Sequence, residues 1–346
     1  MSKGLSIEVQ PNVSIIIPVY NRAKYVHIII NHLIKQTYKD FETIFVVNGN
    51  SEDDSLSVVH KEMQRLPNSK LIVHRENLLF GEARNIGAYN ANGNLIWFLD
   101  IDDEPLSDFL KCMTDIQKKY DADIVICNFL YSTSDKTTIR FNDALKVKVM
   151  SRAEALIARS QEIIPVTAWS KLFRRKLIVD NDLRFKQEYS EDIHYTYEAI
   201  DRSKIVCFYN RPLYIYKINP NSVCNAKRTS DERGISEIKA YDDLEEKFHN
   251  DTKFFPMFRI RSSLIRLRSS GHMSYHEFMR YAKSDRCREM IKRNLTIPLS
   301  FEGIWYRVSP RTYYLIIRVF FKLEYYKDGR MFYKYCRWYK KFLEGW

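Results

Sequence analysis

The sequence predicts an α/β fold with a Rossmann-like, mostly parallel sheet, flanking helices and a C-terminal helical region. Two observations carry this prediction. Apolar runs of strand length alternate with segments of helical periodicity over about the first 130 residues, and turn signals follow several of the runs. From about residue 230 the chain reads as helices rich in Arg, Lys, Tyr and Phe. The 346 residues, 45% of them hydrophobic, suffice for one large domain or two.

Each expected strand is an apolar, often β-branched run bounded by turn residues. These runs are residues 13–19, 41–47, 70–74, 95–99 and 123–131. Between them, apolar residues recur at helical spacing, which predicts one buried face per helix. The expected helices are residues 26–34, 55–65, 81–92 and 106–120, with boundaries good to a few residues.

Charge and cysteine content narrow the class of protein. The net charge of +12 predicts an anionic partner: nucleic acid, an anionic membrane surface or phosphorylated substrates. Six scattered cysteines without a Cys-x-x-Cys pair disfavour a zinc site or a disulfide framework and fit a reducing compartment. The N-terminus lacks the apolar core of a signal peptide, and no window approaches 18 apolar residues. We therefore expect a cytoplasmic protein.

Residues 95–105 combine a buried strand with a cluster of acids. The strand ends in Asp100, Asp102 and Asp103, and Pro105 suits the first turn of a following helix. Carboxylates suit Mg²⁺ or Mn²⁺, which in turn can hold a diphosphate. Because side chains alternate along an extended chain, Asp100 and Asp102 are expected to point the same way. The alternative, a solvated acidic turn, stays open on this stretch alone.

Three of the expected strands end in polar or acidic residues. The ends are residues 18–21, 47–49 and 100–103. In doubly wound sheets, ligands bind outside the carboxyl ends of the strands. The sequence therefore predicts a nucleotide site at this edge and favours a functional acid cluster.

Taken together, five segments resemble the family 2 glycosyltransferases with the GT-A fold, especially bacterial members that build capsule, O-antigen or lipooligosaccharide. The resemblance covers residues 12–222. The matching segments are Val13-Ser-Ile-Ile-Ile-Pro-Val-Tyr-Asn21, Asn77 followed by Gly81-Glu-Ala-Arg-Asn-Ile-Gly87, Phe98-Leu-Asp-Ile-Asp-Asp103 (the Asp-x-Asp motif), Trp169-Ser-Lys-Leu-Phe173 and Glu191-Asp192. Any one motif is weak, whereas five in the right order are strong.

One segment departs from the family. After the second strand the family usually carries Asp-Asp-Gly-Ser, and here the residues are Val47-Asn48-Gly49-Asn50. The second of those aspartates typically contacts the nucleotide base. Asn48 still offers an amide oxygen and an NH₂ group to a base edge. A UDP-hexose donor, the commonest in the family, therefore remains the expectation.

The resemblance implies inverting transfer of a sugar from a nucleoside diphosphate to an acceptor hydroxyl. It implies a divalent metal, Mn²⁺ or Mg²⁺, held by Asp102 and Asp103, and a base at Asp192 with Glu191 beside it. Acids at a helix N-terminus also favour the macrodipole, so the last pair has a structural alternative. The expected donor-binding residues are Pro18, Tyr20, Asn21, Asn48, Arg84, Asp100, Asp102 and Asp103. The expected acceptor-binding residues are Trp169, Lys171 and His194.

The expected domains are a catalytic domain over 1–224 and a basic, aromatic region over 225–346. Within the first, residues 12–131 are the expected nucleotide-sugar half and 132–224 the acceptor half. From Trp305 to Trp346 there are ten Lys/Arg, three Asp/Glu and fifteen aromatic residues. Such a stretch suits an interfacial helix on an anionic membrane, and hence a lipid-linked glycan acceptor at the inner face of the cell membrane. The alternative is a helical subdomain whose aromatic residues are core.

Three other classes of protein fit part of the sequence. A nucleic-acid-binding protein fits the charge, but the chain has no zinc-finger, RRM or KH signature. A nucleotidyltransferase would usually show a Gly-rich phosphate loop after the first strand, which Tyr20-Asn21-Arg22 is not. A catalytically idle relative acting as a scaffold in polysaccharide assembly is the main alternative to the enzyme.

Overall fold

The computed structural model describes residues 11–75, 78–133, 136–137, 147–217, 230–294, 306 and 308–317. The chain forms two compact units. The first comprises the described residues up to Phe129 and from Val147 to Tyr216, and the second comprises those from Leu130 to Thr137 and from Lys217 onward. The domain boundary expected near residue 225 lies outside the described residues.

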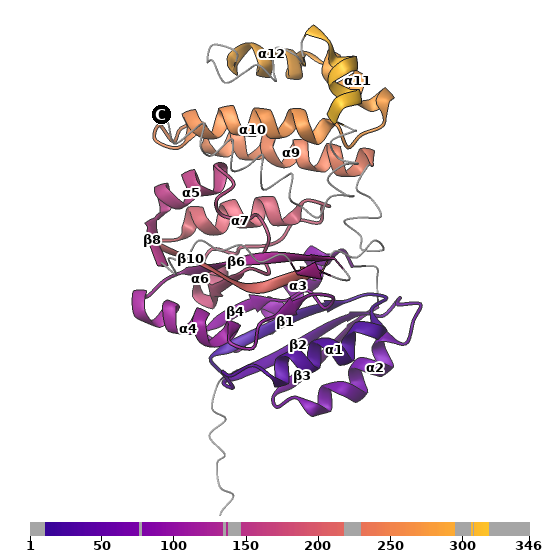
Figure 1. Ribbon diagram of the computed structural model, residues 1–346, viewed down its shortest axis with the longest axis vertical. Coiled ribbons are helices and arrows are strands. Elements are labelled where there is room, and N and C mark those ends of the chain that lie inside the picture. The colour runs from indigo at the N-terminus through magenta and orange to yellow at the C-terminus, as the bar shows by residue number, and fades with distance from the viewer. Residues whose placement is uncertain are drawn as a thin grey trace, which may run out of the picture. The chain divides into compact units, whose positions relative to one another are not determined.

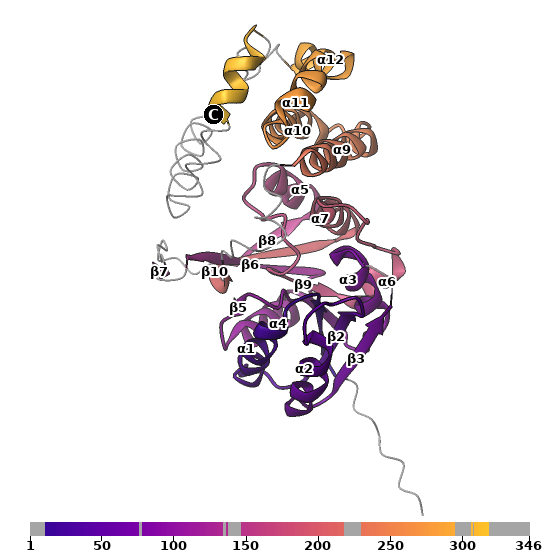
Figure 2. The same ribbon diagram turned by 90° about the vertical axis from the view of Figure 1, so that its right-hand side faces the viewer.

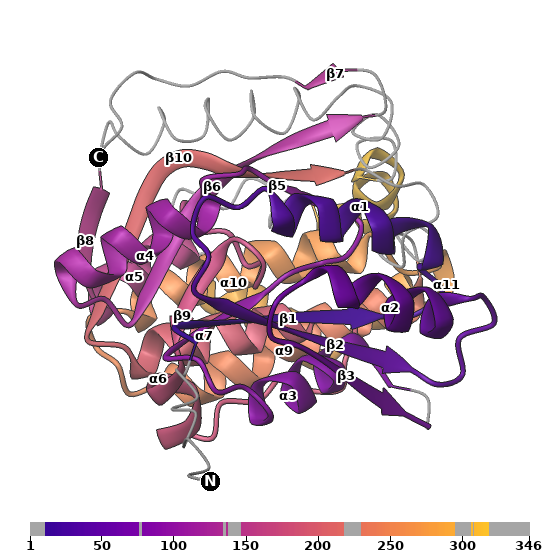
Figure 3. The same ribbon diagram turned by 90° about the horizontal axis from the view of Figure 1, so that it is seen from below.

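The first half of the sheet is parallel, as the alternating pattern predicted. Its strand order is β3-β2-β1-β4, and every pair in it is parallel. Figure 3 shows β1, β2 and β3 side by side. The strands are β1 (Val13–Val19), β2 (Phe41–Asn48), β3 (Ser69–His74) and β4 (Leu95–Phe98). The helices between them are α1 (Ala23–Ile34), α2 (Ser55–Glu62), continued by a 3₁₀ turn at Met63–Arg65, and α3 (Phe80–Tyr89).

Helices cover both faces of this parallel half. Ile15 and Ile17 of β1 belong to the core that Val26 and Ile30 of α1 enter, so they face that helix. The intervening Ile16 faces α3, and a Cβ added to Gly87 would lie 2.2 Å from its Cγ2. Figure 2 shows α3 on the opposite side of β2 from α1 and α2. Gly87 is therefore required by the close approach of α3 to β1.

Beyond β4 the observed ladders are antiparallel. The strand order continues β4-β9-β6-β10-β5, with β7 beside β6 and β8 beside β10. The described pairings in this half, such as β4 with β9 and β10 with β8, are antiparallel. The strands are β5 (Glu104–Pro105), β6 (Ile124–Thr133), β7 (Lys136–Thr137), β8 (Val147–Ser151), β9 (Lys171–Arg174) and β10 (Ile205–Lys217). The alternation of strand and helix segments along the sequence does not indicate this change of strand direction, because strand pairing depends on residues far apart in the chain.

The prediction that Pro105 opens a helix is wrong. Glu104 and Pro105 form β5, which pairs with Ile215 and Tyr214 of β10. Helix α4 begins later and spans Phe109–Tyr120. Since β5 is at the end of the strand order, the missing N–H of proline leaves no central ladder bond unmade.

Three further helices complete the first unit. They are α5 (Arg152–Ser160), α6 (Arg175–Asp180) and α7 (Glu191–Arg202). Helix α5 starts with a capping box in which Ser151 and Glu154 satisfy each other's backbone N–H groups. Helix α7 starts at Glu191, so both acids of the predicted catalytic pair lie in its first turn.

From Asp231 onward the described part of the second unit is helical (Figure 1, orange to yellow). It contains α9 (Asp231–Phe248), α10 (Phe255–Ser270), α11 (Tyr275–Lys283), α12 (Asp285–Asn294) and a helical segment at 310–317. Tyr306, Tyr313 and Tyr314 are buried in its core with Phe278, whereas Leu315 is 63% exposed. These tyrosines are core residues, as the structural alternative for the tail predicted. Across the described ranges, no helix has the length and apolar character needed to span a membrane.

Candidate active site

The carboxyl ends of β1, β2 and β4 lie at one edge of the sheet. The parallel register pairs Val19 with Val47 and Ile16 with Phe98, so the segments that follow these strands are neighbours. Asn21, in the left-handed region with φ 50°, accepts the Glu52 N–H on its Oδ1 at 2.7 Å. This is the edge at which the sequence predicts a nucleotide.

Arg84 joins three carboxylates from distant parts of the chain. It lies on α3 and is 3% exposed. Its Nη2 donates to Asp100 Oδ1 at 2.8 Å, and its Nη1 donates to Glu191 Oε1 and Asp192 Oδ1, each at 2.9 Å. Asp192 Oδ2 accepts the Ala168 N–H at 3.2 Å. The guanidinium thus brings the acid-tipped strand and the first turn of α7 to one point.

Burial decides the protonation of this cluster. Burial, and then the charge of Asp192, raise the pKa of Glu191 to about 8. Burial also raises the pKa of Asp192, although Arg84 acts in the opposite direction. Burial alone lowers the pKa of the Arg84 guanidinium, but the three carboxylates outweigh it and the pKa is raised. At neutral pH the arrangement therefore favours one proton on the Glu191–Asp192 pair, carried by Glu191, while Arg84 stays charged.

The acids of the Asp-x-Asp motif point to different partners. The strand ends at Phe98 and residues 101–102 form a turn, so the alternation expected for Asp100 and Asp102 does not apply. Asp102 Oδ2 lies 3.7 Å from Arg22 Nε, whereas Asp100 meets Arg84. Asp103 is 3% exposed and its Oδ2 accepts the hydroxyl of Tyr214 at 2.8 Å.

These carboxylates fit a metal only as a partial ligand set. Within the described residues, no group of three or more His, Cys, Asp and Glu is arranged to hold a metal ion. Mg²⁺ in phosphate sites is usually bound by one or two carboxylates, with phosphate oxygens and water completing the shell. The side chain of Asp102 is 18% exposed at the strand edge and meets that lower requirement.

The remaining predicted donor residues differ in accessibility. Pro18 lies inside β1 in register with Val46, and Tyr20, half-buried, follows the strand. Asn48 is 4% exposed, and its Oδ1 accepts the N–H of Asn50 at 3.1 Å within its own turn. Asn48 therefore uses its amide oxygen to shape the turn in this structure.

The three predicted acceptor residues are buried. Lys171 is completely buried, and its Nζ donates to the backbone oxygens of Pro165, at 2.7 Å, and Thr167. Trp169 stacks on Tyr214 with ring centroids 4.4 Å apart, and His194 Nε2 lies 3.2 Å from Lys186 Nζ. An acceptor that touches these side chains has to displace the groups that cover them.

The structure adds two partners that sequence reasoning missed. Arg22 reaches Asp102, and Tyr214 reaches Asp103 from a position 111 residues away. Arg22 follows the Tyr20-Asn21 turn and could have been noticed there. Nothing local marks Tyr214, because its role depends on where β10 joins the sheet. Asn77, which begins the second of the matching segments, lies outside the described residues.

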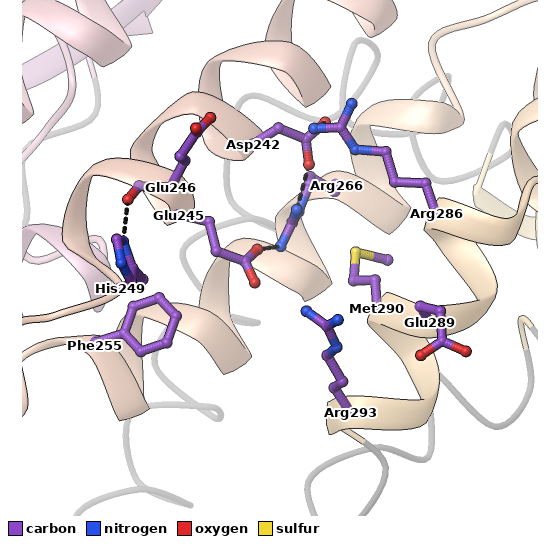
Figure 4. Close-up of a pocket in the computed structure, with 10 residues that line it drawn as sticks. All are labelled: Asp242, Glu245, Glu246, His249, Phe255, Arg266, Arg286, Glu289, Met290 and Arg293. Atoms are coloured by element: carbon purple, nitrogen blue, oxygen red, sulfur yellow. Dashed lines mark hydrogen bonds and ion pairs between the residues drawn. The ribbon is translucent and has the colours of Figure 1, made fainter.

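A separate pocket of about 380 Å³ lies in the second unit (Figure 4). It contains none of the predicted site residues. Its lining residues are Asp242, Glu245, Glu246, His249, Phe255, Arg266, Arg286, Glu289, Met290 and Arg293. Arg266, 3% exposed, pairs with Asp242 and Glu245, and Arg286 pairs with Asp242 at 2.8 Å. Because Asp242 and Glu245 neutralise the buried Arg266, we interpret this pocket as part of an ion-pair network that joins α9, α10 and α12.

Comparison with known proteins agrees with the motifs. Residues 14–181 match the family model "Glycosyl transferase family 2". Over 224 residues the chain is 30% identical to a curated relative, glycosyltransferase GlyA of Streptococcus pneumoniae. That match covers 62% of this chain and 32% of the relative, so the chain spans about a third of that protein's length.

Two solved structures have a similar fold. TarS of S. aureus, in complex with UDP-GlcNAc, superposes with a TM-score of 0.62 at 19% identity, covering 90% of this chain and 92% of TarS. The mannosyltransferase PcManGT of Pyrobaculum calidifontis, in complex with GDP-Man and Mn²⁺, gives 0.54 at 14% identity, covering 90% and 87%. The predicted GT-A fold is confirmed by these neighbours, and the predicted family resemblance is confirmed over residues 14–181, which match glycosyl transferase family 2.

Proposed function

We propose that this protein transfers a sugar, with inversion, from a nucleoside diphosphate donor, UDP-hexose, to a hydroxyl group of a glycan acceptor. The observation that carries the proposal is the Arg84 cluster. One buried guanidinium binds Asp100 beside the nucleotide edge and Asp192 at the start of α7. A base is thereby fixed next to the place where a donor diphosphate would lie.

The donor site is assigned to the carboxyl edge of the parallel strands. Ligands of open α/β sheets bind there, and Asn21, Asn48, Arg84 and the acid turn all border it. The fold likeness to TarS, whose structure holds UDP-GlcNAc, supports a uridine nucleotide. Pro18 and Tyr20 would border the nucleotide from the end of β1.

A divalent cation, Mn²⁺ or Mg²⁺, would be held by Asp102 and by Asp103, whose carboxylate the Tyr214 hydroxyl orients. When bound, such an ion stabilises the negative charge that develops on the leaving diphosphate. The Mn²⁺ in PcManGT supports this assignment. While no cation is bound, Arg22, 3.7 Å from Asp102, would limit the repulsion between the carboxylates of the acid turn.

The base is assigned to Asp192. Its Oδ1 is bound by Arg84 and its Oδ2 by the Ala168 N–H, so both oxygens are fixed while 20% of the side chain stays exposed. A carboxylate with a raised pKa is a better proton acceptor near neutral pH than an ordinary one. The acceptor hydroxyl would lose its proton to Asp192 as its oxygen attacks the sugar C1. Glu191, protonated at neutral pH, would orient the Asp192 carboxylate.

The acceptor is proposed to be a lipid-linked surface glycan, met at the inner face of the cell membrane. The support is the basic, aromatic composition of Trp305–Trp346, of which the structure describes only 306 and 308–317. In those residues Val308, Leu315 and Ile316 are exposed apolar side chains. Deleting 318–346 should abolish binding to anionic vesicles and leave binding to neutral vesicles unchanged. Unaltered binding to anionic vesicles would assign the tail to structure.

A thermal-shift screen of nucleoside diphosphates and their sugars, with and without Mn²⁺, tests the donor class. A ligand that binds only the folded state raises Tm by mass action. We expect a Mn²⁺-dependent shift with UDP and a UDP-sugar. No shift with any nucleotide would favour the catalytically idle scaffold.

Turnover of the donor found in this way tests the mechanism. Asp192→Asn should lower kcat by at least about a hundredfold, the usual contribution of a general base. Asp102→Ala should lower turnover and remove its dependence on Mn²⁺. Near-wild-type turnover in both variants would refute the mechanism.

A further inference from the structure

The segment between α5 and β9, residues 164–170, lies against the proposed base. Its Ala168 N–H is the group that binds Asp192 Oδ2. Lys171 follows directly, and its ammonium group is directed back to the segment, where it donates to the carbonyls of Pro165 and Thr167. The Lys171 side chain therefore closes this segment around a buried cation.

We propose that Lys171 is a positioning residue for Asp192: it fixes the segment that presents the Ala168 N–H and supplies a second buried positive charge that keeps Asp192 ionised. The inference rests on the proposed function, in which Asp192 is the base. Lys171 would not touch donor or acceptor, in contrast to the acceptor role that the sequence predicts for it.

The charges that face Asp192 support this part. Arg84 on α3 and Lys171 on β9 are the cations, and Asp100 and Glu191 are the neighbouring carboxylates. Tyr195, on the next turn of α7, is a further titratable group that senses Asp192. Below about pH 7, with Glu191 protonated and Lys171 charged, two cations face two carboxylates. Without Lys171, Arg84 alone would face both Asp100 and Asp192.

The surroundings of Lys171 make a purely packing role a poor explanation. Burial lowers the pKa of its ammonium to about 7, and the charge of Asp192 acts in the opposite direction. Arg159 and Cys127 are the other ionisable groups that face it. A buried ammonium is costly unless anions or hydrogen-bond acceptors compensate it. Here two carbonyls accept from it directly, and Asp192 acts through space.

Thr196 offers a matched control because it holds the same segment without a charge. From α7, its Oγ1 donates to the carbonyl of Val166 at 2.5 Å. Thr196→Val removes this tether at constant shape. Comparing it with Lys171→Met separates loss of the tether from loss of the charge.

The experiment is the pH profile of kcat for wild type, Lys171→Met, Lys171→Arg and Thr196→Val, with the donor identified by thermal shift. Removing a nearby cation disfavours the carboxylate, so the pKa of Asp192 should rise. We expect the acidic limb of Lys171→Met about one pH unit higher, so that kcat falls by up to about tenfold at pH values below the wild-type limb. Lys171→Arg should restore the limb, and Thr196→Val should leave it in place.

Several outcomes would overturn the inference. One is an acidic limb in Lys171→Met at the wild-type position, and another is an equal displacement in Thr196→Val. Lys171→Gln, which keeps a donor but no charge, replaces Lys171→Met if that variant fails to fold. If neither folds while Lys171→Arg does, Lys171 serves stability alone.

The two proposals fail in different ways. If Asp192→Asn keeps full turnover, the proposed function fails and the Lys171 inference falls with it. If Asp192→Asn is inactive and the limb of Lys171→Met does not move, the inference about Lys171 alone is wrong. In either case, the UDP-induced thermal shift of Lys171→Met reports whether its donor site is still folded.

Discussion

Tyr214 donates a hydrogen bond from its buried hydroxyl to Asp103 Oδ2 at 2.8 Å, across 111 residues of sequence. The Tyr214 ring is stacked on Trp169 with an interplanar angle of 13°. Trp169 is followed two residues later by Lys171, and its neighbour Ala168 binds Asp192. The segment around Trp169 therefore contacts Tyr214, which binds the proposed metal ligand Asp103, and it also binds the proposed base Asp192.

Removing the Tyr214 hydroxyl should weaken metal binding. In Tyr214→Phe the ring still stacks on Trp169, but Asp103 loses the donor that orients it. Removing a group that hydrogen-bonds a metal ligand typically lowers metal affinity by about 10- to 100-fold. We expect the Mn²⁺ concentration for half-maximal activity to rise by about tenfold, with little change in Tm. Tyr209→Phe on the same strand is the control, and an equal effect there would contradict the role of Tyr214.

Replacing Arg84 by methionine should destabilise the first unit strongly. The substitution leaves the half-buried carboxyl groups of Asp100, Glu191 and Asp192 without their shared buried cation. Removing one partner of a buried ion pair typically costs about 3–5 kcal/mol. Urea unfolding measures the loss. Arg65→Met removes an arginine paired with Glu62 at the surface and should change stability little. Similar midpoints for the two variants would refute the clustering of charges at Arg84.

The raised pKa of Glu191 makes stability depend on pH. Its folded-state pKa of about 8 lies above the ordinary glutamate pKa of 4.5, so the folded protein holds this proton more tightly than the unfolded chain. The resulting stabilisation is complete below about pH 4.5 and is lost as the pH rises towards 8. Tm of the wild type should therefore fall between pH 5 and 8 by more than that of Glu191→Gln. Glu246→Gln, at an exposed site on α9, should keep the wild-type slope. Parallel slopes for wild type and Glu191→Gln would contradict the shift.

Gly87→Ala should destabilise the contact of α3 with β1. The added Cβ meets Ile16 Cγ2 at 2.2 Å, and the buried strand cannot move away cheaply. Overpacking of this kind costs about 1–3 kcal/mol, from which the better helix propensity of alanine recovers up to about 1 kcal/mol. Thermal unfolding checks the sign. Tyr89→Ala, at an 85% exposed site on the same helix, should be nearly neutral. A double-mutant cycle with Ile16→Ala should give a favourable coupling, and additivity would rule out the clash.

The sequence by itself determined the parallel half of the sheet and the location of its functional edge. The strand and helix periods of residues 13–98 depend on neighbours a few positions away, so the pattern predicts β1 to β4 and their helices directly. The acid turn after β4 and the acids that begin α7 are equally local features. They can be read without knowing what lies opposite them.

Tertiary structure alone decided which of these features meet. Arg84 lies 107 and 108 residues from Glu191 and Asp192, and Tyr214 lies 111 residues from Asp103, so no local pattern records either contact. The same holds for the antiparallel strands beyond β4, for Pro105 in an edge strand and for the burial of Lys171. Each is set by long-range pairing and packing, in which an unpaired buried charge is too costly to remain. The protonation of Glu191 and Asp192 follows from that burial, because the low-polarity interior disfavours a second negative charge beside the first.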